Sequence, residues 1–532
     1  MLRSPLLLVL ASALPILLYR HPPLMDVPNH LARIWLEAQP GLTGILGQAY
    51  AIEWSRASSN ILVDLVGMQV TRLFGLDAFW LLVTVLMVLG PPLAAILISR
   101  RLNGRDNPWQ ALALSAAWGQ STISGFMNYS LSLALALFFC LLNLGPARTL
   151  GFKARSLLKS VEVLAVYLTH PFGVGLFFAF EFAMLLGPDV DGIRRLTARR
   201  IAAALAEYAL VVALTLVYIA VNRGNSPLEI DPVDYRGFMS HIVSLVSPFF
   251  AYDGAVELPL FAVIALCVAI AALRGAVAFH AGLFVSVVIL GVLSLLIPDG
   301  IGNASLLTRR LPLMAALLIC IAVRPRGTGS FGTGSVGTGP VGTGPVRIGH
   351  RLAMVCGLAI LAHAVWILHV WRAREHDYAD LQQAARLIPA NSKVLSVVRQ
   401  PDAAPNRWSE PGQWVHGFFI RSHLPTMLVP LSRSYVPSLF AIPGQQPLVF
   451  TEAFGPLQAQ IANIPTDRDL AARTPPFPPD RYLDAWECDF DYVLMLRPSR
   501  RDRHVPVHGT RLVLESDFVD LMKVDRPPRC RS

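Results

Sequence analysis

The residues best suited to chemistry stand in one short string near the N-terminus, Met25-Asp26-Val27-Pro28-Asn29-His30-Leu31-Ala32-Arg33. It groups a carboxylate, an amide, an imidazole and a guanidinium within about two helical turns. Proline restricts the residue before it to an extended backbone and can open a helix. Asp26 then lies just before that helix, with His30 and Arg33 on one side of it. From spacing alone, the favoured interpretation is that Asp26 caps the helix and the rest forms an interfacial polar rim.

The composition places this string in a membrane protein. Of the 532 residues, 54% are hydrophobic and only 15% are charged, whereas soluble proteins average about 25% charged residues. Several apolar runs reach the roughly 17–25 residues that a helix needs to cross a bilayer. A single soluble domain and a disordered chain are therefore excluded. The net charge of +10 comes from arginines in short loops between apolar runs, which indicates membrane orientation and not nucleic-acid binding.

The uneven spread of charge predicts two domains. Residues 1–372 form a membrane domain, and residues 373–532 have the composition of water-soluble structure. In the second part, residues 378–387 have helical apolar spacing, 393–398 and 492–496 read as strands, and 511–514 as a weaker third. We therefore expect an all-α polytopic membrane domain followed by a smaller α/β soluble domain.

Four basic loops determine the predicted topology, because Lys and Arg gather on the cytoplasmic side of membrane proteins. They lie at residues 100–105, 148–159, 194–200 and 324–351. If all four are cytoplasmic, an even number of crossings separates each pair, which gives about eleven spans with the N-terminus inside. An uncleaved anchor is preferred to a signal peptide at the N-terminus, because the apolar run continues past Ala11-Ser12-Ala13. The predicted spans are the N-terminal anchor to Leu18 and residues 78–99, 109–127, 128–145, 160–170, 171–187, 201–222, 258–273, 277–297, 305–323 and 351–371.

Two connecting segments have distinct roles in this topology. Residues 21–77 form an outer loop, in which 60–75 read as an amphipathic or partly embedded helix. Residues 324–350 form a cytoplasmic linker rich in Gly and Thr, to which no chemistry is assigned. The soluble domain lies on the outer side, which in a bacterium is the periplasm.

Further polar residues gather on the outer face, although the topology was built from the basic loops alone. Each of them by itself is more often an interface residue satisfied by water or a lipid headgroup, and their common sidedness is what favours a site. His30, Glu53 and His170 also suit zinc or manganese, although their separation is unlike the usual ligand patterns. The polar set that we expect at a substrate site is Asn29, His30, Glu53, Asn60, Asp64, Asn128, Tyr129 and His170.

The Asp-x-Pro-Asn-His-Leu-Ala-Arg string after a first anchor helix resembles the first outer loop of bacterial membrane glycosyltransferases of the GT-C class. Residues 125–129 (Gly-Phe-Met-Asn-Tyr), the turn at residues 168–172 (Leu-Thr-His-Pro-Phe) and the C-terminal outer domain are similar too. In architecture the resemblance covers most of the chain, but its sharp motifs cover only a few dozen residues.

The resemblance implies a hexosyl- or pentosyltransferase of the bacterial inner membrane that takes its sugar from a polyprenyl-phosphate donor. The acceptor would be a glycan, lipid or protein at the outer face, with membrane lipids as further partners and no nucleic acid. No cofactor is implied beyond the divalent metal considered above. By position, Asp26 would be the general base on the acceptor hydroxyl, since a shielded carboxylate has its pKa raised toward useful values. With no second carboxylate beside Asp26, the stereochemistry is expected to invert.

A departing phosphate needs cationic partners, and the planar guanidinium binds phosphate oxygens bidentately. Arg309 and Arg310 begin the tenth span on its outer side, against the positive-inside trend. They are the best candidates for the donor phosphate, with snorkelling at a helix end as the alternative. Arg33 is a third candidate.

Two other classes of function stay open. A flippase or transporter of lipid-linked sugars would use polar residues inside the bilayer, and Glu162, Glu181 and Glu207 lie within apolar runs. Against it, the Asp26 string has no second copy of the kind that transporter repeats produce. A non-catalytic envelope assembly protein is the weakest alternative, because a scaffold does not need the Asp26 string.

The soluble part carries two further features. Cys488 and Cys530 could pair in an oxidising compartment, which the sequence does not decide. Its most site-like residues are Trp414, His416, Arg421 and His423, for which a structural role is expected.

Overall fold

The computed structural model describes residues 5–57, 59–222, 234–235, 237–300, 306–326, 343–401, 408, 410–415, 418–441, 445–459, 463–476, 480–502 and 504–531. The chain forms two compact units. Unit 1 comprises Met1–Pro15, Val85–Thr122 and Asn128–Ile367, and unit 2 comprises Ile16–Thr84, Ile123–Met127 and Leu368–Ser532. The chain enters unit 2 for the last time close to the predicted boundary at residue 372. Residues 16–84, which the charge pattern assigned to the membrane domain, belong to the same unit as the C-terminal residues.

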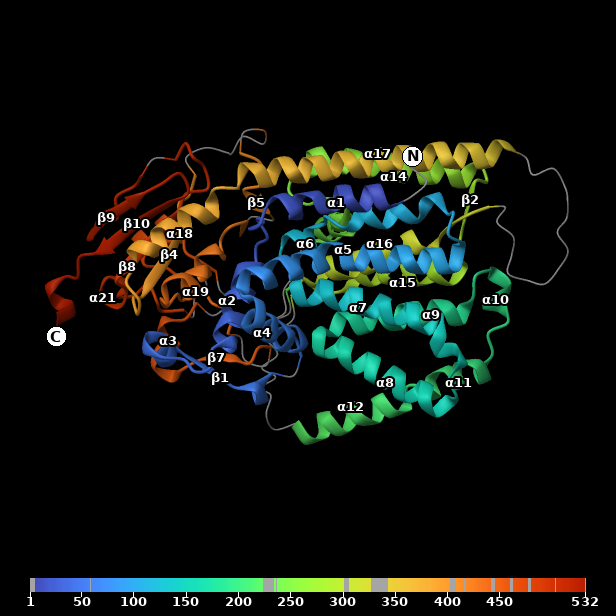
Figure 1. The fold of residues 1–532 in the computed structure, drawn as a ribbon, viewed down its shortest axis with the longest axis horizontal. Coiled ribbons are helices and arrows are strands. Elements are labelled where there is room, and N and C mark those ends of the chain that lie inside the picture. Colours follow the sequence, from blue (N-terminus) through green and yellow to red (C-terminus); the bar gives the residue numbers. More distant parts are fainter. Residues whose placement is uncertain are drawn as a thin grey trace. The chain divides into compact units, whose positions relative to one another are not determined.

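Unit 1 is a helical bundle (Figure 1). Within it, α15 packs against α16 and α9, and α9 packs against α8. A short antiparallel pair, β2 (Val277–Phe279) and β3 (Val323–Pro325), precedes α15 and follows α16. The main helices are α1 (Leu6–Leu18), α5 (Leu76–Asn103), α7 (Met127–Asn143), α8 (Phe152–Thr169), α9 (Pro171–Leu186), α10 (Val190–Arg194), α11 (Ala198–Ala206), α12 (Ala209–Asn222), α13 (Phe238–Leu245), α14 (Gly254–Leu273), α15 (Ala281–Leu296), α16 (Arg310–Ala322) and α17 (Thr343–Ala373).

Three helical stretches in the described chain are long and apolar enough to cross a membrane: Leu76–Asn103, Gly254–Leu273 and Val346–Leu387. The pair α11 and α12 passes the same test together but is bent by 56°. Four shorter apolar helices are α1, α7, α9 and α15. These findings support a membrane protein and leave the count of about eleven spans as a prediction.

The predicted span at residues 109–127 is wrong as a continuous helix. The segment folds as a 3-10 helix, Pro108–Ala116, followed by the one-turn helix α6, Gln120–Ile123. Every residue from 112 to 125 is buried, and Gly119 lies against the backbone of Pro248, where a Cβ would come within 2.6 Å of the carbonyl oxygen. Irregular backbone survives in such a setting because protein, and not lipid, surrounds it. Its apolar composition reflects burial within the protein.

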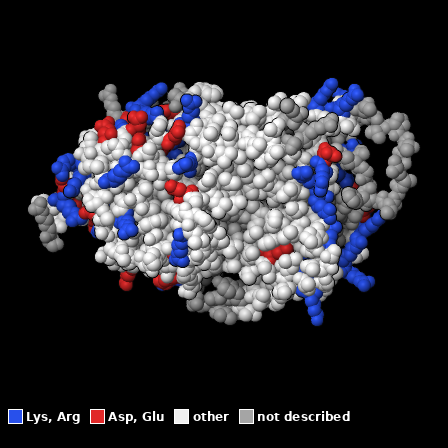
Figure 2. Space-filling model, viewed as in Figure 1, with Lys and Arg blue, Asp and Glu red and all other residues white. Residues whose placement is uncertain are grey.

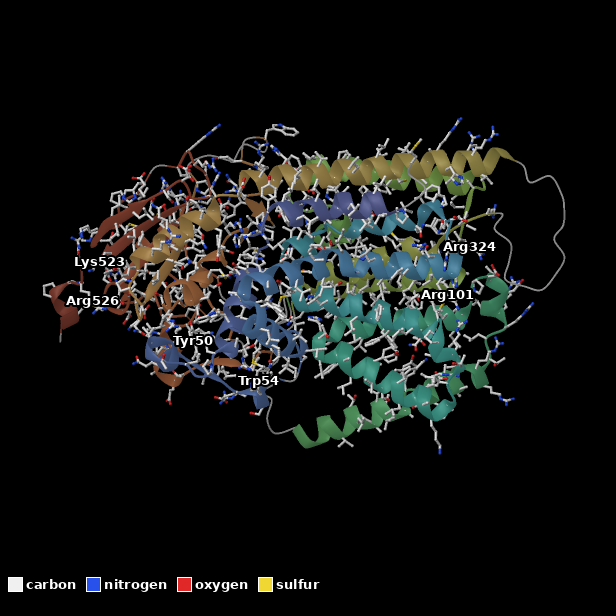
Figure 3. The ribbon with its side chains drawn as sticks, viewed as in Figure 1. Tyr50, Trp54, Arg101, Arg324, Lys523 and Arg526 are labelled. Carbon is white, nitrogen blue, oxygen red and sulfur yellow. A yellow bond between two sulfur atoms is a disulfide. The ribbon has the colours of Figure 1, made fainter. Side chains whose placement is uncertain are left out.

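Charged side chains have a clear pattern on the visible face of unit 1 (Figure 2). The helices show few of them, and Lys and Arg gather at the end where α10 and β2 lie. Arg101 and Arg324, from two different basic loops, both lie at that end (Figure 3). A common end for separate basic loops is what the positive-inside topology predicts. The predicted linker at 324–350 lies outside the described residues from 327 to 342, and α17 begins at Thr343.

Unit 2 is built around a four-stranded sheet in the order β4-β8-β10-β9. β4 (Val394–Val398) pairs with β8 (Tyr492–Leu496) in parallel, and β10 (Val519–Val524) is antiparallel to both β8 and β9 (Thr510–Glu515). The helix α18 (Asp377–Leu387) contacts β10. The expected helix and three strands are thus confirmed, and β10 was missed.

The N-terminal segment of unit 2 packs directly on its C-terminal part. Its helices are α2 (Val27–Ala38), α3 (Gly44–Ala49) and α4 (Leu62–Phe74). Most residues of α2 are buried, mainly against α4, α19 (Leu428–Ser432) and residues 424–427. β1 (Tyr50–Ile52) pairs with β7 (Leu448–Phe450). Tyr50 is labelled in Figure 3, and its hydroxyl donates to the carbonyl of Val436 at 3.0 Å. These contacts hold the start of α2, and therefore Asp26, against residues from the other end of the sequence. A two-stranded pair, β5 (Trp414–Val415) and β6 (Phe418–Phe419), and the short helices α20 (Asp467–Ala472) and α21 (Trp486–Asp489) complete the unit.

Candidate active site

Asp26 is held in place by its backbone. The amides of Met25 and Asp26 donate to the carbonyls of Ile123 and Ser124, at 3.0 and 3.1 Å. Next to them, Gly125 has φ +79°, and a Cβ there would come within 2.6 Å of the Asp26 nitrogen. Only glycine combines this left-handed backbone with so close an approach. The backbone of residues 123–127 therefore fixes the position of the start of α2.

The Asp26 side chain does not cap the helix. Its carboxylate makes no capping hydrogen bond to α2, so the favoured interpretation of the spacing is wrong. Oδ1 instead lies 3.0 Å from Nδ1 of His423, with 14% of the Asp26 side chain and 8% of the His423 side chain exposed. The two atoms are close enough for an ion pair, but their angle does not allow a hydrogen bond. A carboxylate in this position is open on one side and paired with an imidazole on the other.

Phe440 completes the surroundings of this pair. Its ring meets His423 edge-on, with centroids 5.1 Å apart, and lies 5.4 Å from the ring of His30. Asn29 fixes the segment that carries it: the amide nitrogen donates to the carbonyl of Ser438 at 2.7 Å, and the amide oxygen accepts from the Phe440 nitrogen at 2.6 Å. Substrate contact by Asn29 stays a prediction that would require these bonds to open.

His30 and Arg33 face into unit 2. Nη2 of Arg33 donates to Oδ1 of Asp64 at 2.6 Å, and Nη1 lies 3.1 Å from Nδ1 of His30. Nε of Arg33 is 3.6 Å from Glu37, and the side chains of Arg33, Glu37 and Asp64 are all fully buried. Burial, together with the Arg33 charge, holds the pKa of His30 well below its usual range. Burial raises the pKa of Glu37 to about 9 and raises that of Asp64 as well. Asp64, at 2.6 Å, is the closer partner of Arg33.

This cluster changes what can be expected of its members. Arg33 and Asp64 neutralise each other in a closed environment, so donor binding by Arg33 and substrate binding by Asp64 stay predictions that the burial does not favour. Glu53 pairs at the surface with Arg56, at 2.5 Å. Asn60 lies in a bend with φ 62°.

A second group of predicted residues meets within unit 1. Nη1 of Arg310 lies 2.8 Å from Nε2 of His170, and the guanidinium carbon is 5.3 Å from the ring of Phe172 and 5.9 Å from that of Tyr129. The Tyr129 hydroxyl donates to the Arg310 carbonyl. Three segments distant in sequence thus converge on one guanidinium, which aromatic faces and an imidazole orient. Arg309 and Asn128, the neighbours in sequence of Arg310 and Tyr129, are both buried.

Within the described residues, no group of three or more His, Cys, Asp or Glu side chains could hold a metal ion. His30, Glu53 and His170 therefore do not form the metal site considered from the sequence.

The three acids in apolar runs have partners inside unit 1. Lys159 binds Glu181 at 2.8 Å and Glu207 at 2.9 Å, an arginine also pairs with Glu207, and Glu162 accepts from an asparagine amide at 2.9 Å. This arrangement is an internal ionic network and gives no support to a transport path.

His423 is the site residue that sequence reasoning placed only as structural. Its neighbour Arg421 does have the expected structural role: it is buried, pairs with Asp377 at 3.0 Å, and donates to the carbonyls of His21 and Pro22. No local pattern separates the two, because His423 is recognised only once the fold brings it to Asp26. His416 lies outside the described residues, and Cys488 and Cys530 form a disulfide.

No family model matches the chain, and no curated protein matches it. Among solved structures, the crystal structures of ArnT from Cupriavidus metallidurans match, in the apo state (TM-score 0.48, 13% identity) and bound to undecaprenyl phosphate (TM-score 0.47, 12% identity). Each match covers 97% of this chain and 97% of the other. Matches at this level carry no residue correspondence to this chain.

Proposed function

We propose that this chain is an integral membrane glycosyltransferase of the GT-C type, which transfers a sugar from a polyprenyl-phosphate donor to an acceptor hydroxyl on the outer face of the bacterial inner membrane. The observation that carries the proposal is the position of Asp26. Its carboxylate is free of the helix it precedes, lies against His423, and keeps part of its surface open.

Asp26 is the proposed general base. As the acceptor oxygen attacks the anomeric carbon, its proton passes to a carboxylate oxygen of Asp26. The bond from the anomeric carbon to the phosphate oxygen breaks, and the phosphate leaves with the electron pair. His423 is a positioning residue, because an imidazole 3.0 Å from Oδ1 restrains the carboxylate and leaves Oδ2 for the acceptor. Direct displacement of this kind inverts the anomeric centre.

The leaving phosphate is assigned to the second group of residues. Arg310 is oriented by His170, Phe172 and Tyr129, and a guanidinium held in this way can meet the developing charge. Arg309 is the neighbouring candidate.

The outer location of the C-terminal residues has its own support. Cys488 and Cys530 form a disulfide across 42 residues. Disulfides persist in oxidising compartments such as the periplasm and are rare in the cytosol. The basic loops of unit 1 supply the complementary argument for a cytoplasmic side.

Asp26→Asn tests the proposal, because it keeps the shape of the side chain and removes the base. The full chain is purified into nanodiscs and assayed for transfer from a panel of polyprenyl-phosphate sugars, with Asp77→Asn as the control. Asp77 belongs to the same unit, and its side chain is 81% exposed. We expect Asp26→Asn to lower kcat by about 10²–10⁴-fold with little change in Tm, and the control to match the parent. Equal transfer by Asp26→Asn and the parent would contradict the role of Asp26.

His423→Gln separates positioning from base chemistry. A glutamine can still contact Oδ1, so a smaller loss of kcat than in Asp26→Asn is expected, with the donor KM unchanged. A loss confined to Tm would assign His423 to structure only.

A further inference from the structure

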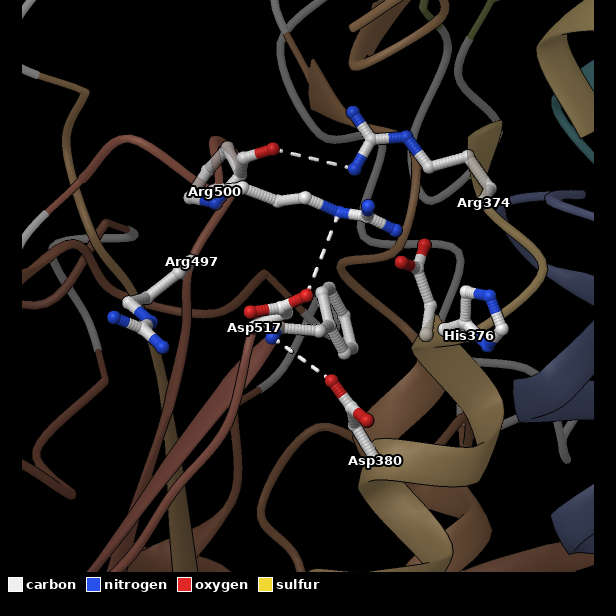
Figure 4. Close-up of a pocket in the computed structure, with 9 residues that line it drawn as sticks. Arg374, His376, Asp380, Arg497, Arg500 and Asp517 are labelled. Atoms are coloured by element: carbon white, nitrogen blue, oxygen red, sulfur yellow. Dashed lines mark hydrogen bonds and ion pairs between the residues drawn. The ribbon is translucent and has the colours of Figure 1, made fainter. Parts of the chain in front are cut away.

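A pocket in unit 2 lies where α17 ends and α18 begins. It is formed by the α17–α18 joint on one side, and by residues 497–500 and 517–518 on the other (Figure 4). The guanidinium groups of Arg374 and Arg500 lie near each other there, with Asp380 and Asp517 beside them. None of its residues belongs to the site proposed for sugar transfer.

Arg374 keeps two side-chain nitrogens without a hydrogen bond to the described residues. It is 6% exposed, and Nη1 donates to the carbonyl of Pro498 at 3.2 Å. Nε and Nη2 have no hydrogen-bond partner among the residues that the structure describes. In Figure 4 its guanidinium faces that of Arg500 across the pocket. A buried guanidinium with two unused N–H directions is costly unless an anion or water meets it.

The charges of Asp377 and Glu410 act on Arg374, but the acidic residues nearby make their hydrogen bonds and ion pairs with other groups. Asp377 pairs with Arg421 at 3.0 Å. Asp380 accepts from the backbone amide of Phe518 at 3.0 Å. Asp517 lies 3.9 Å from Nε of Arg500, which is a loose surface pair.

The other two arginines of the pocket differ: Arg497 is buried between two carboxylates, whereas Arg500 is half exposed. Arg497 is buried and lies between Asp520, at 3.4 Å, and Glu515, at 3.5 Å. The Arg500 side chain is 52% exposed and can change rotamer at little cost. A ligand that enters from solvent would thus meet two cations. The buried guanidinium of Arg374 presents two N–H donors in a fixed position, and the half-exposed Arg500 side chain can adjust to the ligand.

We propose that this pocket binds a phosphate group, carried either by a lipid headgroup or by a free phosphate in solution. The guanidinium fork matches two phosphate oxygens. Nε and Nη2 of Arg374 supply that fork, and Arg500 closes over a third oxygen. The site is separate from the proposed transfer reaction, and binding at it can be measured whether or not that reaction is correct.

The test measures the thermal unfolding of the full chain in two arms. In the first arm, inorganic phosphate is titrated against sodium chloride of equal ionic strength, with the protein in phosphatidylcholine nanodiscs. In the second arm, phosphatidic acid replaces part of the phosphatidylcholine and no free phosphate is added. The variants are Arg374→Gln, Arg500→Gln and the matched control Arg511→Gln, an exposed arginine of β9 in the same unit.

Stabilisation in either arm that Arg511→Gln retains and Arg374→Gln loses supports the site, and the arm identifies the source of the phosphate. Arg500→Gln should weaken the apparent Kd about tenfold, equivalent to about 1.4 kcal/mol. It acts on a half-exposed side chain, so its readout does not depend on whether Arg374→Gln folds. No stabilisation in either arm, or equal loss in all three variants, would overturn the proposal and leave Arg374 to a bound water.

Discussion

The buried pair of Arg33 and Asp64 offers the sharpest test of how unit 2 is held together. Asp64→Asn keeps the shape of the side chain and removes the charge that neutralises a fully buried guanidinium. Breaking a buried ion pair on one side costs about 3–5 kcal/mol. Glu37 lies 3.6 Å from Arg33 and can ionise in its place, so the lower end, about 3 kcal/mol, is expected. For a unit of this size that corresponds to a fall in Tm of about 6–12 °C.

The double variant Arg33→Met with Asp64→Leu is the matched comparison. It removes both charges together, and replacing a buried ion pair by apolar residues is often nearly neutral. Tm is followed by intrinsic fluorescence in detergent for the parent, Asp64→Asn and the double variant, and the folded fraction is checked by size exclusion.

The same pair of variants separates a structural role of Arg33 from donor binding. If Arg33 is structural, the double variant keeps both its Tm and its sugar transfer. A double variant that is stable but inactive would show that Arg33 or Asp64 contacts substrate. An Asp64→Asn variant as stable as the parent would refute the account of the buried cluster.

Three further outcomes are expected. Gly125→Ala should lower Tm more than Gly75→Ala, because both glycines have positive φ (+79° and +87°) but only at Gly125 would a Cβ meet backbone atoms; equal losses in Tm would show that the close approach is unimportant. The pKa of Glu37 is about 9 against an ordinary value of 4.5, so the folded state keeps a proton that the unfolded chain has lost, and stability should fall as the pH rises through this window, by up to about 1.4 kcal/mol per unit. Glu37→Gln should flatten that slope in Tm measured between pH 6 and pH 8, and an unchanged slope would contradict the assignment. Arg310→Gln should raise the donor KM or lower kcat well beyond any change in Tm, whereas parallel losses of activity and Tm would indicate a structural residue.

Local patterns in the sequence were enough to predict several elements of unit 2. Continuous apolar runs gave β4 and β8, and the amphipathic stretch at 60–75 forms α4, which buries Val63, Asp64 and Gly67 and exposes Leu73. β10 was missed because Asp520 and a lysine interrupt its apolar residues. Asp520 is nevertheless fully buried, with His504 at 3.0 Å. The pairing of a buried charge with a residue distant in sequence cannot be predicted from the spacing of apolar residues.

The same limit applied to unit 1 and to the site. Residues 109–127 are apolar enough to span a membrane, but composition does not distinguish a lipid-facing helix from buried irregular backbone. At the site, the string from Asp26 to Arg33 drew attention to Asp26, but its spacing alone favoured a helix cap that the structure does not show. The contact between Asp26 and His423 could not be predicted, because it depends on α2 and residues 424–427 packing together. Sequence order alone contains no signal for that contact.

The interleaving of unit 2 along the chain has a consequence for biogenesis. Its first part, Ile16–Thr84, leaves the ribosome long before Leu368–Ser532, which supplies β7 for β1 and the residues that cover α2. During that interval α2 has α4 beside it but lacks the cover that residues 424–432 supply. For the same reason, a fragment starting at residue 368 would lack β1 and α2, and expressing it alone should yield aggregate in place of a folded domain.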